Sequence, residues 1–260
     1  ALVTAVVLAI QLLFVLYGVD LYNSQLYVSS VIYPFVFSQL ISCGFSIIIT
    51  RYLADCLYEG EYDNVSGSCY GIIFMAQLAG AVAALLFYWD KPLPLHLKLI
   101  TYTFFAEMIA MWLQMVYLTA LKDYKSIFGS YLVGAAISIV LTWLNLQYGF
   151  MAPVEGTMLS MCIGVGIVNL CFMVQIIRYF GYPSQAMNFE FLPYFEQHYK
   201  LFLLIVFYTL SIYVANFIVW NSSWGVMVAG TYLYSPRYDV ITFYAFLSIL
   251  PTMIMFVVSM

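Results

Sequence analysis

Long apolar runs constrain this chain more than any other feature of its sequence. Each run is about as long as the roughly 20 residues with which an α-helix crosses a bilayer. Lipid-exposed backbone must satisfy its own hydrogen bonds, and the runs lack the alternating pattern of a membrane barrel. The sequence therefore predicts an all-α integral membrane protein, a polytopic helical bundle. The expected spans are residues 1–19, 25–50, 66–89, 98–121, 127–148, 156–179, 200–220 and 240–260.

The composition supports a membrane protein and excludes several other classes. Of the 260 residues, 65% are hydrophobic and 8% are charged, whereas a soluble domain carries about 25% charged residues. The Lys and Arg residues are scattered, which excludes the basic surface of a nucleic-acid-binding protein. The cysteines form no CxxC pair and no metal-ligand spacing with histidine. We therefore expect neither a metal nor a cofactor.

Both ends of the sequence lie within apolar runs, at Ala1 and at Met260. No basic segment precedes the first run, so it lacks the pattern of a secretory signal peptide. We expect the sequence to be a fragment of a larger membrane protein, truncated at both ends, with an incomplete last span.

The distribution of Lys and Arg between the loops predicts the orientation in the membrane. One side holds more of these residues than the other, and this small bias places the loops at 51–65, 122–126 and 180–199 in the cytoplasm. Trp89, Tyr148 and Trp220 then fall at the outer ends of their spans. Aromatic residues at such positions anchor helices at the membrane interface.

The longest inner connection, at 181–199, divides the chain, because it follows the sixth span and contains Pro183 and Pro193. We expect residues 1–182 to form a first six-helix bundle, 183–199 a cytoplasmic linker, and 200–260 the first two helices of a second bundle. Repeated bundles of this kind are typical of secondary transporters.

Glu107 lies near the middle of the fourth span, where a carboxylate costs roughly 3 kcal/mol to insert. Helical spacing places Thr103, Glu107, Gln114 and Tyr117 on one face of that span. A polar stripe through an apolar helix favours a wet pathway for a substrate or a coupling ion. The alternative is a protonated carboxyl that is bonded to a neighbouring helix.

Further polar side chains within the spans are candidates for the same pathway, although each also suits packing between helices. The candidates are Asn145, Asn169 and Asn216, accompanied by Ser138, Thr142, Gln175 and Ser211. Two series of small residues are expected to be packing faces. They are Gly67 with Gly71, and Gly156 with Ser160 and Gly164.

Arg51, Asp55 and Glu59 are spaced four apart at the inner end of the second span. They form either a solvated helix end or an inner gate that also docks a partner, and spacing alone leaves both open. No zinc motif, Ser-His-Asp pattern or Gly-rich phosphate loop occurs in the sequence. We therefore do not expect an enzyme, and transport would need an ion gradient, a partner or substrate synthesis as its energy source.

Four segments of the chain resemble the PelG family, the inner-membrane transporter of the Pel exopolysaccharide system. They are Arg51-Tyr-Leu-Ala-Asp-Cys-Leu-Tyr58, Ala120-Leu-Lys-Asp-Tyr124, Tyr234-Ser-Pro-Arg-Tyr-Asp-Val240 and Phe243-Tyr-Ala-Phe-Leu-Ser-Ile-Leu-Pro251. The family belongs to the superfamily of multidrug, oligosaccharide-lipid and polysaccharide flippases. The resemblance implies two six-helix bundles around a central cavity, of which this fragment holds part.

The resemblance also implies a function and partners. It implies export of an N-acetylgalactosamine-rich polysaccharide across the bacterial cytoplasmic membrane for a biofilm matrix. It further implies a complex with a cytosolic glycosyltransferase and membrane-anchored Pel synthase partners. Tyrosine rings suit the CH faces and hydroxyl groups of sugars, so some tyrosines within the spans are expected to line the sugar path. The candidates are Tyr27, Tyr33, Tyr102, Tyr117, Tyr208 and Tyr213.

Other functions remain open at this point. A flippase for a lipid-linked oligosaccharide, or a cation-coupled drug antiporter, would have the same fold. An integral membrane enzyme would need clustered carboxylates or histidines at one membrane face. The acidic cluster from Asp55 to Asp63 has no basic or nucleophilic companion, and a scaffold without transport would not explain Glu107.

Overall fold

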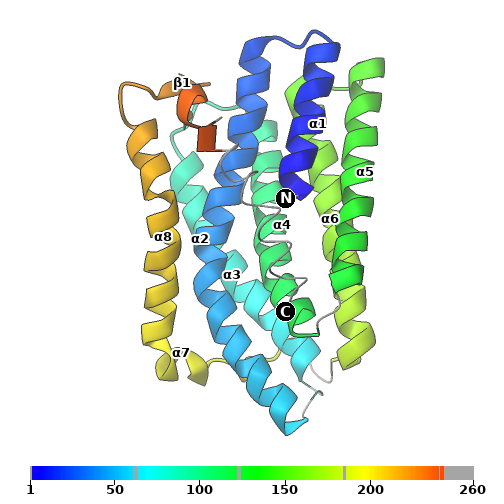
Figure 1. Ribbon diagram of the computed structural model, residues 1–260, viewed down its shortest axis with the longest axis vertical. Helices are drawn as coiled ribbons and strands as arrows, with labels where there is room; N and C mark the ends of the chain where they lie inside the picture. The colour runs from blue at the N-terminus through cyan, green and yellow to red at the C-terminus, as the bar shows by residue number, and fades with distance from the viewer. Residues whose placement is uncertain are drawn as a thin grey trace.

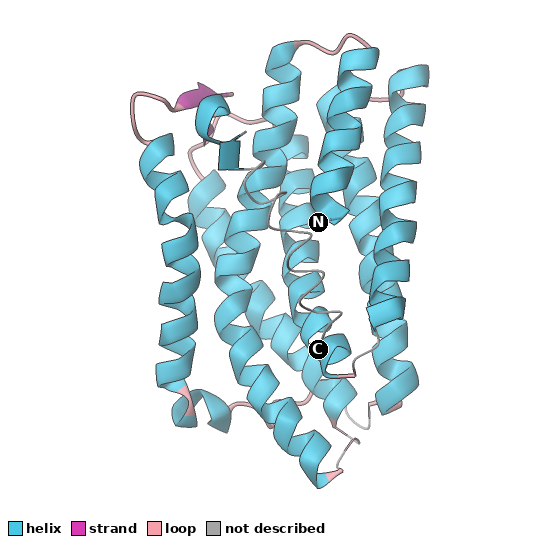
Figure 2. Cartoon of the chain, in the orientation of Figure 1, coloured by secondary structure: helices cyan, strands magenta, loops and turns pink. Residues whose placement is uncertain are grey.

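The computed structural model describes residues 2–60, 62, 64–121, 124–183, 186–239 and 241–242. Helices account for nearly all of the regular structure, and one short hairpin completes it (Figure 2). The elements are α1 (Leu2–Leu16), α2 (Leu21–Glu59), α3 (Val65–Tyr88), α4 (Leu95–Ala120), α5 (Tyr124–Tyr148), α6 (Pro153–Phe180), α7 (Pro193–Gln197), α8 (Tyr199–Trp220), β1 (Val226–Val228) and β2 (Tyr232–Tyr234).

Six of the described helices, α2 to α6 and α8, are long and apolar enough to cross a membrane. The chain is therefore an all-α polytopic membrane protein, as its apolar runs predict. The first predicted span, 1–19, contains the 15-residue helix α1. The eighth predicted span, 240–260, lies outside the described residues except for 241–242.

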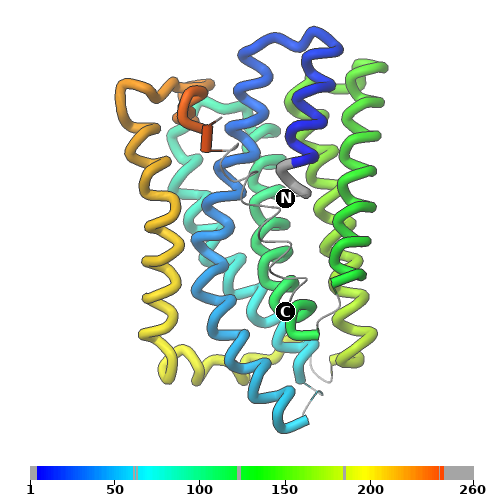
Figure 3. Tube along the Cα trace, viewed as in Figure 1, coloured from blue at the N-terminus to red at the C-terminus, as the bar shows by residue number. Residues whose placement is uncertain are grey.

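The long helices stand side by side, with the hairpin at one end of the bundle and α7 at the other (Figure 1). We call these the hairpin end and the α7 end; the sequence predicts that they are the outer and inner ends. Helix α4 lies centrally and packs against α2, α3, α5 and α6, and α5 pairs with α6. Helix α8 packs on α2, and α1 packs on α5 next to the hairpin end (Figure 3).

Helix α2 is longer than its apolar run. Its 39 residues span roughly 58 Å at 1.5 Å per residue, about twice the hydrocarbon thickness of a bilayer. Asp20 caps the start, since its carboxylate accepts the Asn23 N–H at 3.4 Å. Gly60 ends the helix with φ of 76°, a conformation that glycine adopts without steric cost. The charged ridge from Arg51 to Glu59 is therefore helical and extends past the apolar run.

The small residues of α6 form a packing face against α5, as predicted. A Cβ atom on Gly156 would overlap the Asn145 side chain, and one on Gly164 would lie 2.6 Å from the Gly134 carbonyl oxygen. The two helices therefore approach so closely that a methyl group does not fit between them.

Gly67 and Gly71 have a different partner, because they receive a loop and not a helix. The Asn188 N–H donates to the Gly67 carbonyl oxygen at 3.0 Å. A Cβ atom on Gly71 would overlap the Asn188 carbonyl oxygen and lie 3.2 Å from the Phe191 ring. An irregular backbone can approach a helix this closely only where the helix has no side chains. The predicted packing face is thus correct, but what it packs against was not foreseen.

The hairpin is an element that the apolar pattern does not predict. Strands β1 and β2 pair antiparallel, with Val226 opposite Tyr234 and Val228 opposite Tyr232. Three residues connect the strands, and the Thr231 N–H donates to the Val228 carbonyl oxygen at 3.1 Å. Ala229 and Gly230, the central residues of this turn, both have positive φ angles, as a type I′ turn requires. A Cβ atom on Gly230 would lie 2.8 Å from Pro92, so the turn packs on the connection between α3 and α4.

Candidate functional site

Glu107 lies in the middle of α4, twelve residues after Leu95 and thirteen before Ala120. Its side chain is half-buried between α4 and α6. The Oε1 atom lies 3.1 Å from the position of a Cβ atom on Gly166, so this glycine makes room for the carboxyl group. Asn169, also on α6, donates from Nδ2 to the Glu107 backbone oxygen at 3.0 Å. The structure therefore brings two of the predicted pathway residues together.

The other members of the predicted α4 stripe point to different neighbours. Thr103 is exposed and donates to the Leu99 carbonyl oxygen of its own helix at 3.0 Å. Gln114 is 4% exposed. Tyr117 is fully buried, and its hydroxyl lies 2.9 Å from Ser68 Oγ on α3. The four residues thus share a face of α4 without sharing one cavity.

Several buried acceptors on α4 and α6 receive no hydrogen bond within the described part of the chain. They are Glu107 Oε2, Gln114 Oε1, Asn169 Oδ1 and Gln175 Oε1. Native structures contain few such atoms, and each is explained by local strain, by a catalytic role or by a bound water molecule or ion. The amide of Gln175 does donate, to Ser130 Oγ at 2.9 Å. The four acceptors mark where a polar ligand, a cation or a proton would find partners inside the bundle.

Asn145 and Asn216 make contacts away from Glu107. Asn145 accepts the Met151 N–H at Oδ1 over 3.0 Å and donates to the Met151 carbonyl oxygen over 3.4 Å. Its amide therefore closes the turn between α5 and α6. Asn216, near the end of α8, donates to an Asp239 carboxylate oxygen at 3.5 Å. Both residues stabilise the hairpin end of the bundle.

The charged ridge at the α7 end consists of Arg51, Asp55 and Glu59, which differ in what they contact. Asp55 accepts a hydrogen bond from the Tyr194 hydroxyl at 2.7 Å. This bond, more than burial, raises the pKa of Tyr194 to about 12. Arg51 and Glu59 are exposed, and among the residues that the structure describes no ion pair joins Arg51 to either acid. One residue of the ridge thus holds α7, and two face the solvent.

Glu190, which the sequence did not single out, forms a second link at this end. Its Oε1 atom accepts from Asn64 Nδ2 at 2.9 Å, and its Oε2 atom accepts from the Tyr52 hydroxyl at 3.3 Å. The loop after α6 is therefore bonded to both α2 and the start of α3. No local motif marks Glu190, because its partners lie more than a hundred residues away in the sequence.

At the hairpin end, aromatic side chains from α2, α3, α8 and the hairpin form one cluster, which we call the aromatic cluster. Tyr33 stacks on Trp220 with ring centroids 5.0 Å apart and planes 10° apart. The Tyr33 hydroxyl donates to the Leu233 carbonyl oxygen at 3.1 Å and accepts the Leu233 N–H at 2.8 Å. The cluster consists of Tyr33, Phe37, Phe87, Tyr88, Phe217, Trp220 and Tyr232.

The predicted interfacial role of Trp220 is wrong. Trp89 and Tyr148 are 77% and 66% exposed, as anchors should be, but Trp220 is 2% exposed. Its indole N–H donates to both carboxylate oxygens of Asp239 at 3.1 Å, and one of these oxygens also accepts the Ser235 N–H at 2.9 Å. Burial raises the pKa of Asp239, although these bonds act in the opposite direction. The segment that follows the hairpin therefore buries this tryptophan.

The tyrosines proposed for a sugar path have unlike environments. Tyr27 and Tyr117 are fully buried, whereas Tyr208 is 61% exposed on α8. Tyr213 donates to Gln39 on α2. Tyr33 lines a pocket.

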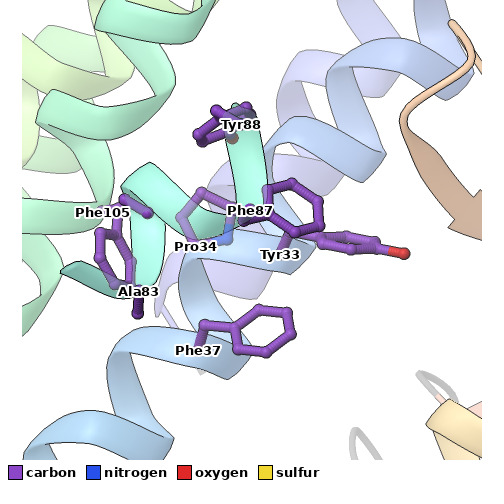
Figure 4. Close-up of a pocket in the computed structure, with 8 residues that line it drawn as sticks. Tyr33, Pro34, Phe37, Ala83, Phe87, Tyr88 and Phe105 are labelled. Carbon is purple, nitrogen blue, oxygen red and sulfur yellow. The ribbon is translucent and has the colours of Figure 1, made fainter. Parts of the chain in front are cut away.

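That pocket lies between α2 and α3 and has a volume of about 100 Å³ (Figure 4). Rings and small apolar side chains surround it: Tyr33, Pro34, Phe37, Ala83, Ala84, Phe87, Tyr88 and Phe105. A smaller cavity of about 30 Å³ lies between α1, α4, α5 and α6. Neither cavity includes Glu107, so the buried carboxyl and the aromatic pocket are separate features.

A comparison with protein families matches residues 1–260, the whole chain, to PelG, described as "Putative exopolysaccharide Exporter (EPS-E)". No curated protein and no solved structure matches the chain. The family match extends over every element described above, from α1 to the hairpin.

Proposed function

The chain belongs to the PelG family of exopolysaccharide exporters, and from this premise we propose that it moves an N-acetylgalactosamine-rich polysaccharide of the Pel type across the bacterial cytoplasmic membrane. One observation carries the proposal: the family match covers the whole chain, and the described residues include six membrane-length helices. Two bundles of the flippase type, formed by residues 1–182 and by the chain from residue 200 onward, would surround the polymer.

Glu107 is the proposed coupling residue. Its Oε2 atom and Asn169 Oδ1 are both buried acceptors that lack a donor among the described residues, and Asn169 is bonded to the Glu107 backbone. A proton on Glu107 Oε2, or a monovalent cation beside it, would supply the partner that this oxygen lacks among the described residues. Gln114 has a buried and unpaired oxygen two turns further along the same face of α4.

The projecting end of α2 is the proposed docking site for the cytosolic glycosyltransferase and the membrane-anchored synthase partners. Arg51 and Glu59 are exposed there, and Tyr58 between them is 93% exposed. A helix of roughly 58 Å cannot be contained in a hydrocarbon layer of about 30 Å. This end therefore reaches the aqueous phase, where a partner can bind it.

A cation-coupled antiporter of drugs is the second candidate, and Glu107 favours it. A half-buried carboxyl in mid-membrane is the kind of group that binds a coupling ion. A flippase for a lipid-linked oligosaccharide shares the same fold. The three candidates differ in substrate, so secretion of the polymer separates the first from the other two.

The test is a deletion of the full gene followed by complementation. Cells without the gene should retain N-acetylgalactosamine-rich polymer, measured with a lectin that binds this sugar in the medium and in lysed cells. Wild-type protein and Glu196→Gln, a change at an exposed site on α7, should restore secretion. Glu107→Gln should reach the membrane in normal amount and fail to restore it.

Two outcomes would contradict the proposal at different levels. Unchanged secretion in the deletion strain would refute polymer export. Restoration of secretion by Glu107→Gln at every pH would leave export intact and refute the coupling role.

A further inference from the structure

The pocket between α2 and α3 has a buried floor and a half-buried rim. Pro34, Ala84 and Phe105 form the floor, and each is at most 9% exposed. Phe37 and Phe87 stand at the rim (Figure 4). The concavity exists because α3 has alanines at 83 and 84, where a larger side chain would fill the space.

The hydroxyl groups around the pocket are already used. The Tyr33 hydroxyl exchanges two hydrogen bonds with the Leu233 backbone, and the Tyr88 hydroxyl lies 2.9 Å from the Tyr232 hydroxyl. A sugar or another polar ligand would lose its hydrogen bonds to water and find no replacement, which costs several kcal/mol. The lining therefore selects an apolar ligand.

The size of the pocket further limits which apolar ligand can bind. Its volume of about 100 Å³ is smaller than the apolar cavity of about 150 Å³ that binds benzene. A pyranose ring, which is larger than benzene, does not fit, whereas a slender aliphatic chain can enter from the open side.

The surroundings indicate where such a chain comes from. Leu86 lies next to Ala83 around α3 and is 78% exposed, and Val82 and Leu85 are 59% and 58% exposed. These residues belong to a membrane-length helix, so the face that borders the pocket contacts lipid. The pocket opens within the half of the bundle that carries the hairpin.

We propose that this pocket binds one acyl chain of a phospholipid from the membrane leaflet at the hairpin end. The chain lies against Phe37 and Phe87 and reaches the floor at Ala84. The lipid thus fills the space below the aromatic cluster and supports the packing of α2 against α3. The inference is independent of which substrate the protein transports.

The test compares two substitutions one turn apart on α3. Ala83→Leu places a larger side chain in the pocket, and Ala79→Leu adds the same atoms at an exposed position of the same helix. The full-length protein is purified in mild detergent, and bound phospholipid is counted by native mass spectrometry. Wild type and Ala79→Leu should retain a phospholipid that Ala83→Leu loses, with all three proteins remaining folded in the detergent.

A second measurement does not depend on how the variants fold. Wild-type protein is reconstituted with phospholipid that carries a photoreactive group near the end of one acyl chain, and a parallel sample contains photoreactive polyprenyl phosphate. After extraction into detergent and illumination, the phospholipid should label Phe37 or Phe87. Labelling by the polyprenyl probe alone, absence of label at both rings, or equal lipid retention in the two alanine variants would overturn the proposal.

Discussion

The Tyr33 hydroxyl offers the sharpest test of how the hairpin is held. It makes two hydrogen bonds with Leu233, at 3.1 and 2.8 Å, across 200 residues of sequence. The substitution Tyr33→Phe removes these bonds and keeps the ring that stacks on Trp220 at 5.0 Å. Any effect therefore reports the hydroxyl and not the aromatic packing.

The expected magnitude follows from the backbone groups that lose their partner. Tyr33 is 8% exposed and Leu233 is half-buried, so the Leu233 N–H and C=O lose their partner in a place that water reaches only in part. One fully buried group without a partner costs about 1–3 kcal/mol, and because both bonds are only part-buried we expect the two groups together to cost about the same amount. At about 1.4 kcal/mol per tenfold change, the hairpin should open roughly 5 to 150 times more often. Hydrogen–deuterium exchange in the peptide that contains Leu233 should accelerate by the same factor.

Tyr22→Phe is the matched control, because Tyr22 is 53% exposed and also lies on α2. Its exchange profile should equal that of the wild type. If Tyr33→Phe leaves exchange at residues 231–235 unchanged while the rest of the protein stays folded, the hydroxyl does not hold the hairpin and the reasoning is refuted.

Three further predictions concern other contacts. Gly164→Ala sets a methyl group against the α5 backbone, so the free energy of unfolding in detergent should fall by about 1–3 kcal/mol. Gly129→Ala, in open space on α5, should instead raise the free energy of unfolding by up to about 1 kcal/mol. Equal changes in the two variants would contradict close packing of α5 on α6. The hydrogen bond to Asp55 raises the pKa of Tyr194 to about 12. This bond therefore contributes fully to stability below the ordinary tyrosine pKa of about 10, and the contribution is lost as the pH rises through about 12. The titration of Tyr194 is obtained by subtracting the tyrosinate absorbance of the Tyr194→Phe variant. Asp55→Asn should shift this titration toward lower pH, and an unshifted titration would exclude the hydrogen bond. Gly71→Ala should push away the loop that packs on it and speed proteolysis within residues 181–192; an unchanged rate would show that the loop does not need the glycine.

The helices could be predicted because membrane insertion depends on local apolar length. The fourth predicted span, 98–121, corresponds to Leu95–Ala120, and the seventh, 200–220, to Tyr199–Trp220. Hydropathy did not predict where α2 ends, because charged residues stop the apolar run while the helix continues to Glu59. An apolar run marks the limits of contact with lipid, whereas a helix ends where its hydrogen bonds end.

The candidate site was less predictable because its contacts join distant segments. Helical spacing places Glu107 and Tyr117 on one face of α4, yet Glu107 meets α6 and Tyr117 meets α3. Because Trp220 lies at the end of a span, it was expected to anchor the helix at the membrane interface, but contacts with Asp239 and Tyr33 bury it. A single sequence shows which side chains are unusual in a membrane and does not show which neighbour each one meets.

Three contacts of α2 with the segment from α7 to the hairpin lie at equal intervals. Tyr33 bonds the hairpin, Gly44 lies against the Phe202 ring of α8, and Asp55 accepts from Tyr194 of α7. Steps of eleven residues are close to three whole helical turns, or about 16 Å, so these contacts form one straight seam along α2. The hairpin is also fastened to α3 and to the connection that follows it, because the Tyr88 and Tyr232 hydroxyls lie 2.9 Å apart and Gly230 packs on Pro92. The segment from α7 to the hairpin is therefore held along the length of α2 and again at the hairpin end, and neither rotating it about α2 nor tilting it can leave all of these attachments intact.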